Sequence, residues 1–310
     1  MSVSNLLVVS LQKISTTLFC TEKKQRMKHY NILIFVLAGI MIHGNVSSQK
    51  KQKTETLQLN DIEKSLAKVS DNLYAGKYEV SNSLYRIFED DLKKNNKTDA
   101  LKISKVDTLN WRDKLAFNEP YVDYYYRHPV YKDYPVVNIS YDAAVLFCEW
   151  LTTKYNESPK RKFKKVLFRL PTSKEWTKAA RCEETSIPYP WGSKLLYKSK
   201  NACNFKSFGD ERITFRKDLN TYEIVKNPYS NAFEISASAD ITAPVKSYIP
   251  NKFGLYNVCG NVAEMLVEKG KTRGGGWKDT GWDVRIDAVG TYEKSATDIG
   301  FRYFMDVIEK

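Results

Sequence analysis

Histidine is scarce in this chain of 310 residues, which contains only His29, His43 and His128. A metal site built from several histidines therefore lacks ligands, and a serine or cysteine nucleophile would find few bases. His128 precedes a proline in a tyrosine-rich segment, where a solvated or packing role is favoured over a catalytic one. The 14 glycines and 10 prolines are too few for a collagen-like or low-complexity protein.

Long hydrophobic runs are also missing. The apolar segment 32–42 has eleven residues, short of the roughly 20 that a membrane-spanning helix needs. Basic residues precede this segment, and small polar residues with a possible cleavage site at residues 46–48 follow it. This order is typical of a secretory signal, with a membrane anchor as the alternative. We therefore predict that residues 1–48 are an N-terminal extension and signal peptide, with either Met1 or Met27 as the start.

The overall composition is that of a soluble globular protein, with 42% hydrophobic and 27% charged residues. The formal charge of +13 is spread along the chain, apart from one basic cluster at residues 160–165. A nucleic-acid interface would need such a cluster beside base-stacking aromatics. In an exported protein, a solvated loop or a contact with an anionic envelope surface is favoured instead. We expect no nucleic-acid partner and only peripheral contact with a membrane.

Composition divides the mature chain into two parts. Residues 49–74 are polar and lysine-rich, and they are interpreted as a tail or linker, with a loose first helix as the alternative. Residues 75–310 contain the regular apolar patterns of a folded domain. Residues 93–135 are rich in tyrosine, aspartate and lysine and are interpreted as long surface loops. From about residue 186 onward, turn signals dominate and clear helices are few.

Local signals inside the domain indicate both helices and strands. Ser81 and Ser140 are predicted N-caps of helices with apolar stripes, and Thr172 opens a capping box that ends at Glu175. Residues 78–80 and 166–168 are predicted strands. The expected fold class is α+β with an unusual amount of irregular backbone. Such backbone needs partners for its polar groups, and bound metal ions are one common device.

Several segments, taken together, resemble one known family. In order, they are Gly76–Asn82, Tyr134–Ser140, Phe147–Leu151, Arg169–Trp176, Ala179–Arg181, Tyr189–Gly192, Pro250–Tyr256, Gly260–Glu264, Arg273–Trp277 and Gly300–Arg302. Their joint order and spacing resemble the formylglycine-generating enzymes, also called sulfatase-modifying factors. The resemblance covers about residues 75–308 and implies a compact α+β fold related to C-type lectins. Residues 126–137 also resemble the family's branch in envelope-associated proteins of gliding bacteria.

The resemblance implies a copper site that this sequence does not supply. Active members oxidise a substrate cysteine with a copper ion held by two thiols that follow the Arg-Gly-Gly motif. Here those positions fall near Asp279 and Val284, and no cysteine occurs after Cys259. Soft thiolates select Cu(I), and a carboxylate with a valine cannot replace them. A second branch uses iron held by three histidines, which are also missing. We therefore expect neither copper nor formylglycine-generating activity.

Four cysteines remain in the mature chain: Cys148, Cys182, Cys203 and Cys259. Cys148 lies on a predicted apolar helix and is interpreted as a buried core thiol. Four cysteines allow three disulfide connectivities, and the sequence does not choose among them. No C-x-x-C spacing indicates zinc binding or thiol exchange.

By the resemblance, one calcium site is retained. The segment Asn257–Glu264 matches a calcium-binding loop of the family, with ligands from the Asn257 side chain, the Gly260 and Val262 carbonyls and the Glu264 carboxylate. Hard oxygens converging on a tight glycine turn suit a structural calcium ion. The alternative is a turn in which Glu264 only caps backbone amides. A second family site would use Asn204 and Phe205, but the usual upstream acid is missing, with Ala237 near that position and Glu234 or Asp240 as substitutes.

The family's substrate groove would be lined by Trp277, Asp279, Trp282 and Arg285. These residues either form a peptide-binding cleft that was retained after catalysis was lost, or they pack against the rest of the domain. The sequence leaves both alternatives open. The leading hypothesis is an exported, non-catalytic family member of the cell envelope. It would bind a protein, a peptide or a glycan, and a role near secretion or gliding machinery follows from the resemblance alone. The alternative is a divergent formylglycine-generating oxidase that acts on sulfatases.

Overall fold

The C-terminal strand β12 (Phe304–Glu309) lies inside a four-stranded sheet and joins distant parts of the chain. The protein is represented by a computed structural model that describes residues 56–112, 118–184, 186–197, 200–206, 211–226 and 241–310. These residues belong to a unit that begins at Glu55. The predicted signal peptide lies outside the described residues. No helix within the described ranges is long and apolar enough to cross a membrane.

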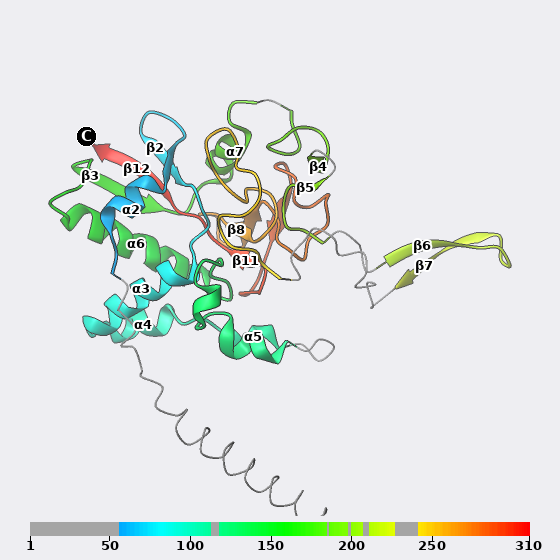
Figure 1. Cartoon of the computed structure of the whole chain (residues 1–310), viewed down its shortest axis with the longest axis horizontal. Helices are drawn as coiled ribbons and strands as arrows, with labels where there is room; N and C mark the ends of the chain where they lie inside the picture. The colour runs from blue at the N-terminus through cyan, green and yellow to red at the C-terminus, as the bar shows by residue number, and fades with distance from the viewer. Residues whose placement is uncertain (1–55, 113–117, 185, 198–199, 207–210, 227–240) are drawn as a thin grey trace, which may run out of the picture. The chain divides into compact units, whose positions relative to one another are not determined.

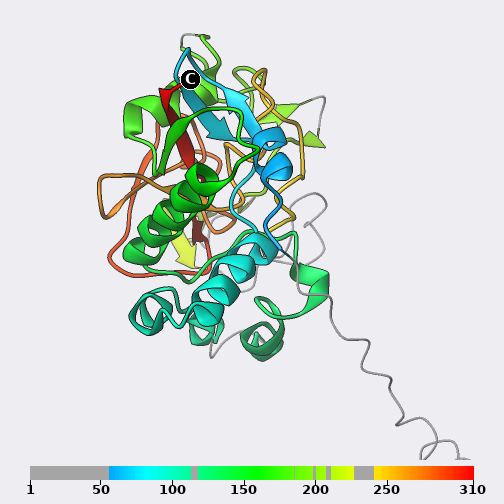
Figure 2. The ribbon, with the colours of Figure 1, turned by 90° about the vertical axis from the view of Figure 1, so that its left-hand side faces the viewer.

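The first sheet has the order β1-β2-β12-β3, and every neighbouring pair in it is antiparallel. Its other strands are β1 (Leu66–Lys68), β2 (Leu73–Gly76) and β3 (Lys165–Arg169). The long helix α6 (Tyr141–Glu157) packs beside β3 (Figures 1 and 2). Aromatic rings from the helices and the sheet, among them Phe88, Phe147 and Phe301, fill the core between these elements.

The strongest local predictions are confirmed. Ser81 and Ser140 cap α3 (Asn82–Lys94) and α6 by accepting hydrogen bonds from backbone amides three residues ahead. Thr172 and Glu175 form the complete capping box of α7 (Ser173–Arg181). The predicted strand at residues 166–168 is the centre of β3. These features form because a side-chain oxygen satisfies amides that the first helical turn leaves unpaired.

The segment 93–135 is more helical than predicted. It contains α4 (Thr98–Ile103), the 3₁₀ turn η1 (Thr108–Trp111), α5 (Glu119–Tyr124) and the 3₁₀ turn η2 (Pro129–Tyr131). Helices of six residues or fewer are marginal alone, so their local signal is weak. Here tertiary contacts hold them: the Trp111 and Tyr125 rings lie 4.6 Å apart, and both side chains are buried.

The prediction of a polar tail or linker is wrong for residues 56–74, whereas the alternative of a first helix in this segment is confirmed. Helix α2 (Leu59–Lys64) and strands β1 and β2 are part of the folded unit, and Ile62, Ala67 and Val69 are buried. The apolar residues are few and separated by charged ones, so their burial depends on pairing β2 with the distant strand β12. The strand predicted at residues 78–80 is also wrong, because the strand lies earlier and ends at Gly76.

A second four-stranded sheet contains the segments with the family's glycine-rich motifs. It has the order β10-β9-β8-β11 and is built from β8 (Ala263–Met265), β9 (Lys271–Arg273), β10 (Val289–Thr291) and β11 (Ile299–Gly300). Two hairpins complete the described strands: β4 (Leu196–Tyr197) with β5 (Lys200–Asn201), and β6 (Glu211–Arg216) with β7 (Thr221–Lys226). As predicted, the described residues after 186 contain no helix.

Candidate functional site

The predicted calcium loop is a buried turn that leads into β8. Asn257, Gly260 and Asn261 all have positive φ, at 52°, 74° and 69°. This left-handed geometry favours glycine and asparagine and reverses the chain sharply. As a result, the backbone amide of Asn261 donates a hydrogen bond of 2.7 Å to the carbonyl of Asn204. The residues of the two predicted metal sites therefore lie side by side.

Glu264 is fully buried and is held by two partners. The Arg302 guanidinium donates to both of its oxygens, with Nη2 2.6 Å from Oε1 and Nε 3.0 Å from each oxygen. The indole Nε1 of Trp176 donates to Oε2 at 2.7 Å. In the described structure, Glu264 accepts hydrogen bonds from these two side chains and not from backbone amides, so the alternative of a carboxylate that caps backbone amides is wrong. Arg302 belongs to a motif of the resemblance, yet sequence reasoning gave it no role.

A second buried carboxylate, Glu79, completes this network. It accepts hydrogen bonds from Asn257 Nδ2 at 2.9 Å and from Asn261 Nδ2 at 3.0 and 3.1 Å. Burial raises the pKa of Glu79 to about 8, against the lowering effect of Arg302, and the nearby charge of Glu264 raises it further. Sequence analysis missed Glu79 because it lies 178 residues before Asn257, within a segment interpreted as an ordinary strand.

The donor set around Asn257 fits an oxygen-ligated cation. Asn257 Oδ1 is buried and has no hydrogen-bond partner in the described structure, which is costly for an amide oxygen. Two buried carboxylates, Glu79 and Glu264, lie in this region beside the single buried guanidinium of Arg302. A carboxylate has about four lone-pair sites, and Glu264 already accepts three contacts from Arg302 and one from Trp176, so a cation would have to replace one of them at this side chain. Hard oxygens suit calcium, and a bound dication would favour the ionised form of Glu79, whose pKa burial raises to about 8.

The second predicted metal site is incomplete in the described residues. Asn204 is buried, and its Nδ2 donates to the Ile241 carbonyl at 2.8 Å and to Asn261 Oδ1 at 3.3 Å. Phe205 is buried in the core. The candidate acids, at positions 234 and 240, lie outside the described residues, as does Ala237. Asn204 therefore serves here as a structural link to the first loop.

The positions expected for the catalytic thiols have other roles. Asp279 Oδ2 accepts a hydrogen bond of 2.7 Å from the Gly276 amide, and burial raises the pKa of Asp279. Val284 is completely buried and packs in a core cluster with Cys203 and Cys259. One position therefore shapes the glycine-rich turn and the other fills the core, and neither can bind copper as a thiolate.

Cys148, Cys182, Cys203 and Cys259 are buried as free thiols, so the described residues contain none of the three possible disulfide connectivities. Burial raises the pKa of Cys148, Cys182 and Cys203, and that of Cys203 reaches about 12. The pKa of Cys259 is raised by burial and by its neighbour Cys203. Since the thiolate is the metal ligand and nucleophile, these protonated side chains are inert at neutral pH.

The four predicted cleft residues divide into two environments. Trp277 packs: its ring stacks on Trp111 at 6.3 Å and its Nε1 donates to the Thr297 carbonyl at 2.9 Å. Trp282 is 68% exposed, with the Arg285 guanidinium 3.3 Å from its ring centroid. An arginine over the face of a tryptophan is a cation–π contact, and both residue types are enriched among those that dominate binding at interfaces. The packing alternative thus fits Trp277, and the binding alternative fits Trp282 and Arg285.

Comparisons with known proteins agree with the motifs. Residues 20–307 match the family described as the sulfatase-modifying factor enzyme 1-like domain. The formylglycine-generating enzyme of Thermomonospora curvata is 30% identical over 136 residues, which cover 44% of this chain and 34% of that protein. The inactive C-alpha-formylglycine-generating enzyme 2 of Bos taurus is 25% identical over 186 residues, covering 55% of this chain and 50% of that protein.

The chain thus spans about a third to a half of the length of these curated relatives. Among solved structures, PvdO from Pseudomonas aeruginosa has a TM-score of 0.49 at 17% identity, over 76% of this chain and 80% of that one. The match to the family begins at residue 20, before the segment 75–308 that carries the motifs. The mixture of helices and strands confirms the α+β fold class. The chain belongs to the family of sulfatase-modifying factor enzyme 1-like domains.

Proposed function

We propose that this chain is a non-catalytic member of its family that binds a protein or peptide of the cell envelope. The observation that carries the proposal is the chemistry of Asp279 and Val284 at the positions of the family's thiols. A half-buried carboxylate that caps a turn and a valine without any exposure cannot hold Cu(I), which needs soft sulfur ligands. A relative named as inactive shows that the family includes such proteins.

The proposal includes export to the periplasm or cell envelope. The basic segment, apolar run and small polar residues at the N-terminus have the order of a secretory signal. In the folded unit, the exposed Trp282, with the partly buried Arg285 over its ring, offers the contact surface for the partner. Arginine and tryptophan are enriched among the residues that dominate binding energies.

A divergent oxidase is the second candidate, and one observation favours it. Cys203 and Cys259 lie in the same core cluster as Val284, and Cys203 contributes to the raised pKa of Cys259. If the cluster opened, these two thiols would be the ones available to hold copper beside residue 284. Their burial and raised pKa values oppose this role.

An oxidation assay separates the two candidates. We expect no aldehyde product when the purified mature protein is incubated with copper, oxygen and a peptide that carries a sulfatase-type cysteine motif, with mass spectrometry as the readout. An active family member run in parallel controls for peptide and copper. Aldehyde formation that is lost in Cys203→Ser or Cys259→Ser would establish the oxidase instead.

The proposal also includes a structural calcium ion at Asn257, Gly260, Val262 and Glu264. A ligand that binds only the native state stabilises it by about 2.7 kcal/mol at a hundredfold excess over Kd. We therefore expect a calcium chelator to lower the Tm of the wild-type protein, measured by circular dichroism.

Variants at positive φ make the calcium test specific. Asn257→Gly removes the unpaired Oδ1 and keeps a residue that tolerates a φ of 52°, so it should lose the response to the chelator. Asn96→Gly is the matched control, because Asn96 has a φ of 53° and lies exposed after α3. An equal chelator response in all three proteins would contradict the site.

A further inference from the structure

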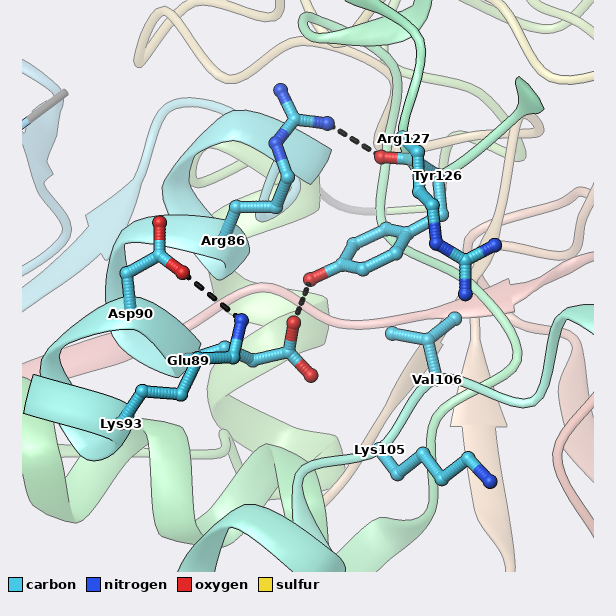
Figure 3. Close-up of a pocket in the computed structure, with 8 residues that line it drawn as sticks. All are labelled: Arg86, Glu89, Asp90, Lys93, Lys105, Val106, Tyr126 and Arg127. Carbon is cyan, nitrogen blue, oxygen red and sulfur yellow. Dashed lines mark hydrogen bonds and ion pairs between the residues drawn. The ribbon is translucent and has the colours of Figure 1, made fainter. Parts of the chain in front are cut away.

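A cavity of about 300 Å³ opens between α3 and the loops that follow α4 and α5 (Figure 3). Four basic and two acidic side chains, a valine and a tyrosine line it. No residue of the calcium loop or of the Trp282 surface belongs to it. Small-molecule sites typically occupy about 300–1,000 Å³, so this one suits a ligand the size of a single sugar residue.

The floor of the cavity is fixed by Tyr126. Its hydroxyl donates a hydrogen bond of 2.6 Å to Glu89 Oε2, while its backbone carbonyl accepts from Arg86 Nη1 at 2.5 Å (Figure 3). Tyr126 is buried and Glu89 is partly buried. Among the described residues, the other oxygen of Glu89 has no hydrogen-bond partner. It is therefore an acceptor held in place and available to a ligand.

Two cations of the lining are available as well. Lys93 forms an ion pair of 3.0 Å with Asp90, so this pair neutralises itself. Arg127 and Lys105 are exposed, and within the described ranges their side chains make no hydrogen bond or ion pair. In Figure 3 their charged groups lie on either side of Val106. Each therefore offers donors to an anionic oxygen group at the edge of the cavity.

The two cations and the free oxygen of Glu89 together determine which kind of ligand the cavity can bind. A carboxylate or phosphate satisfies Arg127 and Lys105, but a bare multivalent anion would be repelled by Glu89. Glu89 instead accepts hydrogen bonds from hydroxyl groups. An acidic sugar carries both features within one ring: a carboxylate and neighbouring hydroxyls. We propose that this cavity binds a uronic-acid residue, with Arg127 and Lys105 on its carboxylate and Glu89 on its hydroxyls.

This inference goes beyond the proposed function, because the cavity is separate from the Trp282 surface and would hold a sugar rather than a protein or peptide. The probe is D-glucuronate, titrated into the mature protein and followed by calorimetry, with D-glucose and inorganic phosphate as comparison ligands. We expect glucuronate to bind measurably and glucose to bind at least about tenfold more weakly, since glucose lacks the charge-assisted contact. Phosphate should also bind more weakly than glucuronate.

Three variants test the assigned roles. Arg127→Gln should weaken glucuronate binding by at least about tenfold, the loss of one charge-assisted contact. Glu89→Gln should also weaken it, because it removes the charged acceptor while its amide oxygen can still accept from Tyr126. Lys94→Gln is the matched control: Lys94 is exposed on α3 but does not line the cavity, so binding should be unchanged.

Glu89→Gln separates a sugar site from a simple anion site. If Glu89→Gln strengthens binding of phosphate and of glucuronate alike, the cavity attracts anions only, and the acidic-sugar assignment is overturned. Absence of glucuronate binding in protein with a native circular dichroism spectrum would overturn it too. Neither result would change the outcome expected in the oxidation assay. Aldehyde formation in that assay would overturn the proposed function, whatever the sugar titration shows.

Discussion

Arg302→Met is expected to lower the free energy of unfolding by about 3–5 kcal/mol, because it leaves a buried carboxylate without its partner. Arg302 and Glu264 are both inaccessible to solvent and lie 2.6 Å apart. Arg302 also donates to the carbonyls of Gly76 at 2.8 Å and Tyr256 at 2.7 Å, which would lose a donor. Methionine preserves much of the volume, so the loss measures charge and hydrogen bonding rather than a cavity.

Urea unfolding of the two proteins at the same pH measures this effect. The double variant Arg302→Met with Glu264→Gln should recover part of the lost stability, since it removes the unpaired charge. Lys164→Ala is the control, because Lys164 pairs with Glu309 at an exposed site and its loss should leave the midpoint within error. A midpoint for Arg302→Met equal to that of the control would show that the buried pair does not hold this region together.

Gly260→Ala is expected to destabilise the fold by about 2–5 kcal/mol, the sum of two costs. The φ of Gly260 is 74°, where an L-residue with a side chain is strained. In addition, a Cβ at this position would overlap the carbonyl oxygen of Asn204. That oxygen accepts the Asn261 amide at 2.7 Å, so it cannot move away without breaking the contact between the two loops.

Gly254→Ala separates these two costs. Gly254 has a φ of 84°, but a Cβ there would meet no atom within 4 Å. It should therefore lose only the backbone term of about 1–2 kcal/mol. Both variants are compared with the wild type by urea unfolding, and the calcium response of Gly260→Ala is measured where it folds. An equal loss of unfolding free energy in the two variants would mean that the Asn204 carbonyl moves away from the new Cβ at little cost.

Features that depend on neighbouring residues were predictable from sequence. The caps at Ser81, Ser140 and Thr172 are present because a capping side chain acts within three residues of its own position. The absence of a residue type was equally predictable, since a chain without cysteine after residue 259 cannot place a thiol at position 279 or 284. The family followed from the order of motifs, which is itself a property of sequence.

Predictions from local sequence patterns were wrong where contacts with distant residues determine the secondary structure. Residues 59–74 read as polar, yet β2 is a strand because it pairs with β12 more than 200 positions later. The short helices of residues 93–135 form because aromatic rings from separate turns meet around Trp111 and Tyr125. An isolated segment of six residues carries too little free energy to fix its own conformation.

The sequence by itself determined the family, the helix caps and the absence of any cysteine after Cys259. Only the tertiary structure decided the environment of each charge. It joined Glu79 to Asn257, buried Arg302 against Glu264, and placed Lys105 and Arg127 around one cavity. The reason is physical: the free energy of a charge depends on the dielectric and the partners around it, and these come from residues far away in sequence.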